Sequence, residues 1–437
     1  MKDFFLRLCI PSLLFLGLTG SFTARAETEI QAESRTEPKA ESKASQDTPF
    51  KFSGFGTLGV TYNTSRDFDY IRDLLQTTGV GASRRIDLGL DSLLGLQLSA
   101  PIIDNLEATA QVVARRSYRG FRPELSWLFV KYSPDDNLDL RVGRLGFDVY
   151  PLADSRNVGY SYLWVRPPVD YFGNLIISYI DGADAVYKFN TETTQTKIKF
   201  FSGQAQEQVL VDAPDNFFSL KGSRIFGGHL EFQSQHWLAR VGLTNLRFKN
   251  ELPSLLPLFA ALNSLELIAI NPSLPQLAHD LSFKEKRVRY LCAGLVYGQG
   301  PLQAQLMYSR LKSESLGFNS NQSAFITVGY RHKEWTPYVT LAKTKPIDYR
   351  ALGNSLPSGT NVQFDQINAA VQSVSSSTLS EQNTQSLGLR YSLSNSSDIK
   401  VQFDHLDATQ RGLVRAAQAT WNGKANIITC TFNFIFN

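Results

Sequence analysis

The sequence predicts an all-β protein, a transmembrane barrel of sixteen antiparallel strands. Three observations predict this fold: the start of the chain is typical of an exported protein, its last segment has one aromatic and one polar face, and alternating segments of about ten residues recur from residue 50 onward. Together they place the protein in the cell outer membrane, where we expect it to contact lipid and lipopolysaccharide.

The last segment, residues 426–436, is the most informative. Successive side chains of a strand point to opposite faces, so one face of this segment is aromatic and apolar and the other is mostly polar. The first face carries Ile428, Cys430, Phe432, Phe434 and Phe436, and the second carries Thr429, Thr431 and Asn433. In an exported protein this pattern predicts the closing strand of a barrel, with its aromatic face in lipid.

The first 26 residues form the predicted signal peptide. Lys2 and Arg7 precede an apolar run over residues 8–18, and Ala24-Arg25-Ala26 has the small residues of a cleavage site. The apolar run is shorter than the roughly 20 residues that a transmembrane helix needs. Residues 27–49 have almost no apolar content, so we expect a disordered periplasmic tether before the barrel over residues 50–437.

Sixteen alternating segments are found in residues 50–437. In the second, for example, Leu88, Leu90 and Leu94 are expected to face outward and Asp87 and Asp91 inward. The predicted strands are 50–62, 86–99, 106–116, 125–133, 138–145, 183–190, 196–202, 225–233, 237–248, 288–297, 302–311, 324–332, 336–343, 386–393, 399–406 and 426–436.

The connections between these segments alternate between short turns and longer loops. This is the pattern of an up-and-down barrel with both chain ends in the periplasm. Barrels of sixteen to eighteen strands enclose an aqueous channel, whereas eight-stranded barrels are filled by their own side chains. The default function is therefore passive diffusion of small hydrophilic solutes and ions.

Composition excludes several other classes. Lys and Arg number 44 against 40 Asp and Glu, so no nucleic-acid surface is expected. Two cysteines follow the signal peptide, Cys292 and Cys430, too few for a disulfide framework. The GxGxxG pattern at residues 54–59 lies inside a strand, where it cannot place a helix N-terminus at a pyrophosphate. We expect no cofactor, no metal and no enzyme activity, since none of the five histidines has metal-ligand spacing.

The connection after the fifth strand, residues 146–182, is rich in aromatic residues and prolines, unlike a solvated loop. It is the candidate for narrowing an otherwise open tube. Here the chain resembles the general bacterial porins, through the strand ending Arg141-Val142-Gly143-Arg144 followed at once by a long third external loop. Residues 158–168 are similar to porin-like proteins of Gram-negative bacteria. The family's Pro-Glu-Phe-Gly-like loop tip is absent, and Asn437 follows the terminal aromatic residue.

The resemblance implies a homotrimer whose third external loop folds into the lumen and sets the pore size. It also implies that acidic loop residues oppose basic wall residues across a constriction. The acidic candidates are Asp148, Asp154 and Asp170, and the basic candidates are Arg85, Arg115, Arg141 and Arg144. Arg144 is out of phase with Arg141, which suggests the barrel rim or a bulge. The alternative is that all seven are ordinary lumen or rim charges. Lumen charges of both signs are mixed, so strong anion selectivity is not predicted.

Two other external connections stand out. Residues 249–287 contain an apolar run that predicts a short amphipathic helix, which could cover the pore mouth, contact lipopolysaccharide or a neighbouring subunit, or form a small core of its own. Residues 344–385 are rich in Ser, Asn and Gln and are expected to be mobile. Two other functions stay open: a substrate-preferring channel of the same fold, and a non-conducting structural or adhesive protein.

Overall fold

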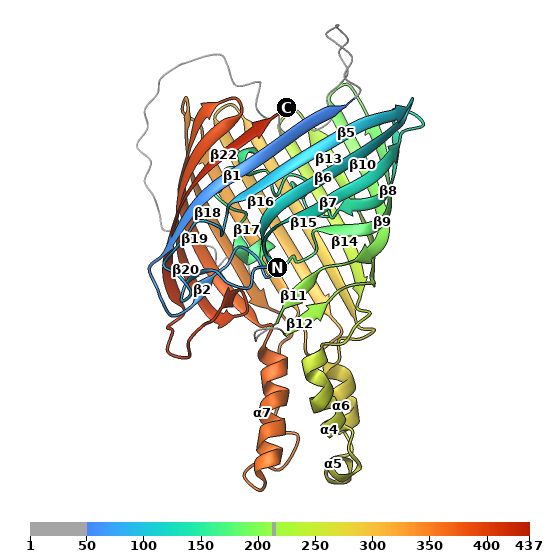
Figure 1. Cartoon of the computed structure of the whole chain (residues 1–437), viewed down its shortest axis with the longest axis vertical. Helices are drawn as coiled ribbons and strands as arrows, with labels where there is room; N and C mark the ends of the chain where they lie inside the picture. The colour runs from blue at the N-terminus through green and yellow to red at the C-terminus, as the bar shows by residue number, and fades with distance from the viewer. Residues whose placement is uncertain (1–49, 212–215) are drawn as a thin grey trace.

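The computed structural model describes residues 50–211 and 216–437; the predicted signal peptide and tether lie outside the described residues. The described chain forms a closed antiparallel barrel (Figure 1). Its wall consists of β1 (Lys51–Asn63), β4 (Ile86–Asp87), β5 (Leu93–Ile103), β6 (Leu106–Ser117), β7 (Gly120–Tyr132), β8 (Leu138–Gly146), β9 (Tyr179–Asn190), β10 (Thr194–Ala205), β13 (Ser223–Ser234), β14 (Trp237–Arg247), β15 (Arg287–Gln299), β16 (Leu302–Ser313), β17 (Asn321–Tyr330), β18 (Trp335–Pro346), β19 (Ser380–Ser394), β20 (Ser397–Arg411) and β22 (Lys424–Phe436).

These segments occupy sixteen positions in the wall, because β4 and β5 both pair with β1 and together form the second strand. The prediction of sixteen antiparallel strands is confirmed. Three short strands outside the wall, β2 (Asp69–Tyr70), β3 (Val80–Gly81) and β21 (Val414–Arg415), form a small sheet, and β11 (Gln208–Leu210) pairs with β12 (Phe217–Ser219).

The two faces of the wall separate as the alternation predicts. On β22, Ile428 and Phe432 are exposed on the outer face, whereas Thr429, Thr431 and Asn433 are buried on the inner face. A closed hydrogen-bonded wall with an apolar outer surface satisfies every requirement for crossing a lipid bilayer. The protein is a transmembrane barrel of the outer-membrane type.

The second strand is interrupted, and this corrects one sequence-based expectation. The Asp87 carboxylate accepts hydrogen bonds from the backbone N–H groups of Gly89 (2.6 Å) and Leu90 (2.9 Å), which turns the chain between β4 and β5. Leu90 therefore points into the molecule and is buried, although simple alternation places it on the lipid face.

The barrel closes where β1 pairs with β22, in a register of ten residue pairs from Gly54–Phe436 to Asn63–Ile427. Two glycines of the GxGxxG pattern at residues 54–59 lie at this seam, where no larger side chain would fit. A Cβ atom at Gly56 would lie 2.4 Å from the ring of Phe434, and one at Gly54 would lie 2.3 Å from that of Phe436. The glycines thus make room for aromatic rings that lie across the neighbouring strand.

Replacing Gly56 with valine is expected to weaken closure by roughly 1–3 kcal/mol, because the added carbons displace the Phe434 ring. The measurement is the temperature at which the folded band disappears in a heat-modifiability gel. Gly353→Val is the matched control, since a Cβ atom at Gly353 has no neighbour within 4 Å. Equal midpoints for the two variants would show that the seam tolerates the larger side chain.

The two long external loops fold into helices at one end of the barrel, opposite the end that carries the C-terminus (Figure 1). Residues 249–287 contain the 3₁₀ turn η2 (Pro253–Leu255) followed by α4 (Leu256–Leu262), α5 (Leu265–Ile270) and α6 (Leu274–Leu281). Residues 344–385 contain α7 (Val362–Ser376). No helix in the described residues is long and apolar enough to cross a membrane.

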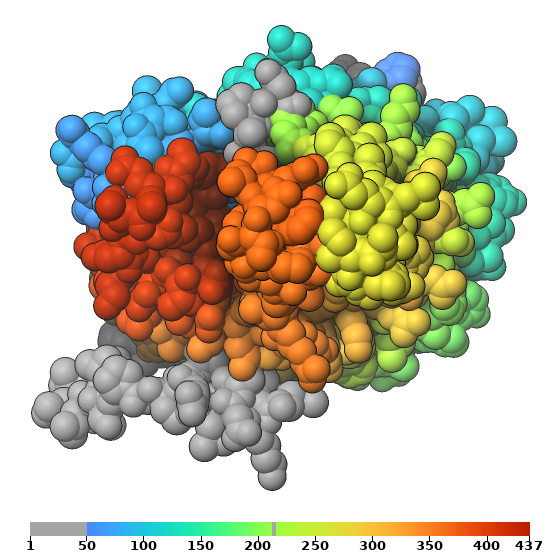
Figure 2. Space-filling model, turned by 90° about the horizontal axis from the view of Figure 1, so that it is seen from below, coloured from blue at the N-terminus to red at the C-terminus, as the bar shows by residue number. Residues whose placement is uncertain are grey.

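Part of the Ser-, Asn- and Gln-rich segment 344–385, which we expect to be mobile, is the helix α7. The Asn361 side chain caps this helix by accepting a hydrogen bond from the Gln363 N–H group, 2.8 Å away. Ile367 and Val371, one turn apart, are buried in a cluster with Leu262, Leu267, Leu274, Ala278, Leu281 and Leu356. The two loops therefore share one small core, and they lie side by side on the external face (Figure 2).

Candidate functional site

The connection between β8 and β9, residues 147–178, lies inside the barrel and contacts opposite sides of its wall. We call it the internal loop; it contains η1 (Gly159–Ser161) and α3 (Val169–Phe172). Its two ends meet at the wall, where the Phe147 N–H group donates to the Ser178 carbonyl at 3.1 Å. The chain leaves the wall, crosses the lumen and returns to the neighbouring strand.

Arg166 fastens the internal loop to the side of the wall around the closing seam. Its guanidinium group is 1% exposed and donates two hydrogen bonds to the Asp91 carboxylate, at 2.9 Å and 2.8 Å. A third contact, 3.3 Å long, reaches the carboxylate of Asp404 on β20. Burying an arginine is strongly unfavourable without such partners, so the loop and these two wall residues depend on each other.

Lys400, on β20, holds the same part of the loop through backbone groups. Its ammonium group is fully buried and donates to the carbonyls of Gly159 (2.5 Å), Tyr162 and Trp164 (3.0 Å). Three carbonyl oxygens match the three N–H donors of a lysine. The ammonium group of Lys400 on the wall thus holds this part of the internal loop through its backbone carbonyls.

A second group of charges holds the start of the loop against β10 and β14. The Asp148 carboxylate lies 2.6 Å from the ammonium group of Lys199. Arg240 donates to the backbone carbonyls of Asp148 (2.7 Å) and Tyr150 (2.9 Å) and also pairs with Glu231. The loop is therefore anchored to the wall on two opposite sides of the lumen.

Between these anchors the loop is held by aromatic packing. The rings of Trp164 and Tyr171 meet Phe325 of β17 edge to face, with ring centroids 5.4 Å and 5.3 Å apart. The Trp164 indole N–H group donates to the Thr327 hydroxyl at 2.7 Å. These contacts give the loop a core of its own in the middle of the barrel.

The internal loop does not cover the wall evenly. Charged side chains that face the lumen from β6, β7, β8 and β10 keep accessible surface: Glu107 is 37% exposed, Lys131 25%, Arg141 24% and Lys197 30%. On β20, by contrast, Asp398 and Lys400 have fully buried side chains. The part of the lumen that remains accessible and charged lies along β6–β10.

Comparison with solved structures identifies the fold. OmpF of Salmonella typhi, in a complex with daunomycin, superposes with a TM-score of 0.52 and 10% identity over 89% of this chain and 97% of that chain. The anion-selective porin of Comamonas acidovorans gives 0.52 and 12% over 89% and 99%, and OprB of Pseudomonas putida gives 0.50 and 12% over 89% and 94%. The chain has a porin barrel. No family model and no curated protein matches its sequence.

The structure separates the three acidic candidates of this porin barrel. Asp148 is buried in its ion pair with Lys199. Asp154 is exposed within reach of the charges of Arg141, Lys199 and Arg240. Asp170, in α3, is fully buried on the far side of the lumen, beside Gln382 and Thr384 of β19.

The basic candidates occupy four different surroundings. Arg141 faces the lumen and forms a bidentate pair with Asp184, at 2.9 Å and 2.7 Å. Arg144 is on the opposite face of β8, where it pairs with Asp181 and lies over the ring of Tyr179. Arg85 is exposed at the external end of the barrel, against the Tyr62 ring. Arg115 alone lies in a small cavity of the lumen.

That cavity, which we call the arginine cavity, has a volume of about 30 Å³. It places Arg115 beside arginines that the sequence analysis did not identify. Arg72 and Arg156 line it with Arg115, and the one carboxylate in its lining belongs to Asp73, 3.6 Å from Arg115. Three arginines and one aspartate thus line a space that holds about one water molecule. Arg72 comes from the first external loop and Arg156 from the internal loop, so no local pattern links them.

The buried Asp170 predicts a pH dependence of stability. Burial raises the pKa of its carboxyl group to about 6. The raised value means that the neutral form stabilises the folded chain below pH about 4, and that this contribution is lost as the pH rises through about 6. Asp170→Asn should therefore stabilise the barrel at pH 8, by on the order of 2–3 kcal/mol, and have little effect at pH 4.

The measurement is the heat-modifiability midpoint of both chains from pH 4 to pH 8. Asp136→Asn, at an exposed aspartate in the turn between β7 and β8, is the control. A difference between Asp170→Asn and the natural chain that does not change with pH would contradict the assignment.

Proposed function

We propose that this protein is an outer-membrane porin that lets small hydrophilic solutes and ions diffuse passively through a water-filled channel. The observation that carries the proposal is the uneven cover of the lumen. The internal loop buries the charges of β20, while Glu107, Lys131, Arg141 and Lys197 keep accessible surface along β6–β10. A route lined by partly hydrated charges of both signs suits polar solutes of either charge.

Deleting residues 148–164 is expected to increase single-channel conductance several-fold without unfolding the barrel. The deletion removes the carbonyl partners of Lys400 and one of the two carboxylate partners of Lys199, which keeps its ion pair with Asp184 at 2.8 Å. Water entering the lumen can hydrate both ammonium groups. The measurement is conductance in planar bilayers at 1 M salt, together with heat-modifiability to verify folding.

Removal of residues 357–360 from the external loop before α7 is the matched control, since these residues are exposed and lie outside the lumen wall. Unchanged conductance after deletion of residues 148–164 would place the limiting constriction elsewhere. Absence of conductance in the natural chain would instead favour the structural or adhesive alternative.

The arginine cavity favours one form of the substrate-preferring alternative, a channel that prefers anions. Arg72, Arg115 and Arg156 outnumber Asp73 in the cavity lining, and Glu124 and Glu207 act on Arg115 and Arg156 from outside that lining. Ions in a narrow, partly desolvated gap respond strongly to fixed charge. The other charges near the accessible route are largely compensated, as in the Arg141–Asp184 pair.

Neutralising Arg115 and Arg156 together, both to glutamine, should move the reversal potential in a salt gradient toward cation preference. The shift should shrink near 1 M salt, where the Debye length is about 3 Å. Arg144→Gln is the control, because Arg144 is on the outer face of β8. A double variant with the reversal potential of the natural chain would exclude the cavity as the selectivity site.

The resemblance to the general porins also makes a homotrimer our proposal for the assembly. The mass of the detergent-solubilised complex, measured by light scattering after subtracting the detergent, tests it directly. A complex with the mass of a single chain would contradict the proposal.

A further inference from the structure

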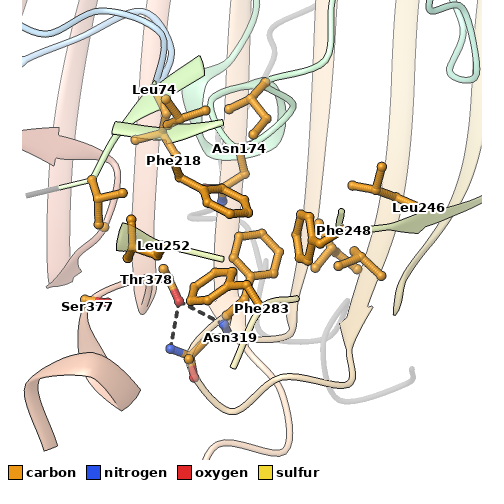
Figure 3. A pocket seen from close by; sticks show the side chains of 18 of the residues that line it. Leu74, Asn174, Phe218, Leu246, Phe248, Leu252, Phe283, Asn319, Ser377 and Thr378 are labelled. Atoms are coloured by element: carbon orange, nitrogen blue, oxygen red, sulfur yellow. Dashed lines mark hydrogen bonds between the residues drawn. The ribbon is translucent and has the colours of Figure 1, made fainter. Parts of the chain in front are cut away.

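An apolar chamber of about 180 Å³ lies between the external end of the barrel and the helical loops. Aliphatic and aromatic side chains make up most of its lining, and Phe218 meets Phe248 and Phe283 with ring centroids 5.2 Å and 5.0 Å apart. Figure 3 shows these rings converging from the β11–β12 hairpin, the end of β14 and the loop after α6.

The wall of the chamber is unusual for an aqueous channel. Five of its lumen-facing positions on β13–β16 are apolar or aromatic, namely Ile225, Leu246, Val288, Tyr290 and Leu311; Thr244 of β14 is polar. Lumen-facing residues of a water-filled barrel are mostly polar, as Thr327 and Thr340 are, whereas Phe325 of this wall is covered by the internal loop. Five apolar residues on four adjacent strands therefore form a distinct surface inside the barrel.

Two polar atoms in this lining have no hydrogen-bond partner within the described residues: the Thr244 hydroxyl oxygen and the Asn174 amide nitrogen. Thr244 is 3% exposed, and its hydroxyl group can donate or accept. The Asn174 amide nitrogen can only donate. Buried polar groups nearly always have partners, so unpartnered ones in an apolar chamber indicate a ligand with one small polar group.

We propose that this chamber binds a neutral, single-ring aromatic solute that carries a hydroxyl group, the phenol class. An empty apolar cavity of about 150 Å³ accommodates benzene, so 180 Å³ accommodates one substituted ring. The surrounding phenylalanine rings offer edge-to-face contacts to a flat ligand. The ligand hydroxyl group accepts from Asn174 and bonds to Thr244. The inference goes beyond passive diffusion and does not require it.

The test is the ¹⁹F NMR signal of 4-fluorophenol titrated with the folded mature chain in detergent. The natural chain should show saturable binding. Thr244→Val, which keeps the shape but removes the hydroxyl group, should bind about fivefold more weakly, as expected for the loss of one hydrogen bond. Leu246→Trp fills the chamber and should abolish saturable binding.

Val241→Trp is the matched control, because Val241 is on the lipid-facing side of the same strand and is 55% exposed. It should bind 4-fluorophenol as the natural chain does, which accounts for uptake by the detergent. Non-saturable binding to the natural chain would overturn the proposal, as would unchanged affinity in Leu246→Trp or Thr244→Val. Displacement by cyclohexanol as effective as by phenol would overturn the aromatic assignment.

Failure of this site and failure of the channel proposal are distinguishable. A chain that binds 4-fluorophenol but does not conduct in planar bilayers supports the chamber and contradicts the porin function. A chain that conducts but does not bind overturns the chamber alone.

Discussion

Backbone hydrogen bonding between β1 and β22 is the constraint on which the rest of the molecule depends. In lipid every peptide group must find an internal partner, and a sheet can achieve this only by closing on itself. The ten-pair register of the seam achieves closure, and Gly54 and Gly56 make room for the aromatic rings that cover it. Closure with sixteen strands then creates a lumen too wide for the wall side chains alone to fill.

The internal loop occupies much of that lumen, and its position is determined by electrostatic compensation. Arg166 brings a charge to Asp91 and Asp404, and Lys400 takes its partners from the loop backbone. Removing one member of such a buried set typically costs about 3–5 kcal/mol, because the remaining charge is left without compensation. The same contacts that stabilise the loop therefore prevent it from leaving the lumen.

The lumen is divided into parts of different chemistry. Accessible charges along β6–β10 form a polar region, whereas aromatic and aliphatic side chains on β13–β16 form the chamber under the helical loops. The internal loop borders both: Arg156 lines the arginine cavity, and Ile177 lines the chamber. One segment can thus separate a route for hydrated solutes from a site for an apolar one.

The sequence by itself determined the barrel. Alternation on segments such as residues 426–436 specifies which side chains face lipid, and it does so locally, because a strand has a period of two. Alternation also placed Arg141 in the lumen and Arg144 out of phase with it. Only the tertiary structure decided the ion pairs, since Asp184 and Asp181, the partners of these arginines, are about forty positions away. The arginine cavity combines residues from different loops, and α7 forms because Ile367 and Val371 find a core on another loop. Such contacts depend on which segments the closed barrel brings together, and no local periodicity encodes them.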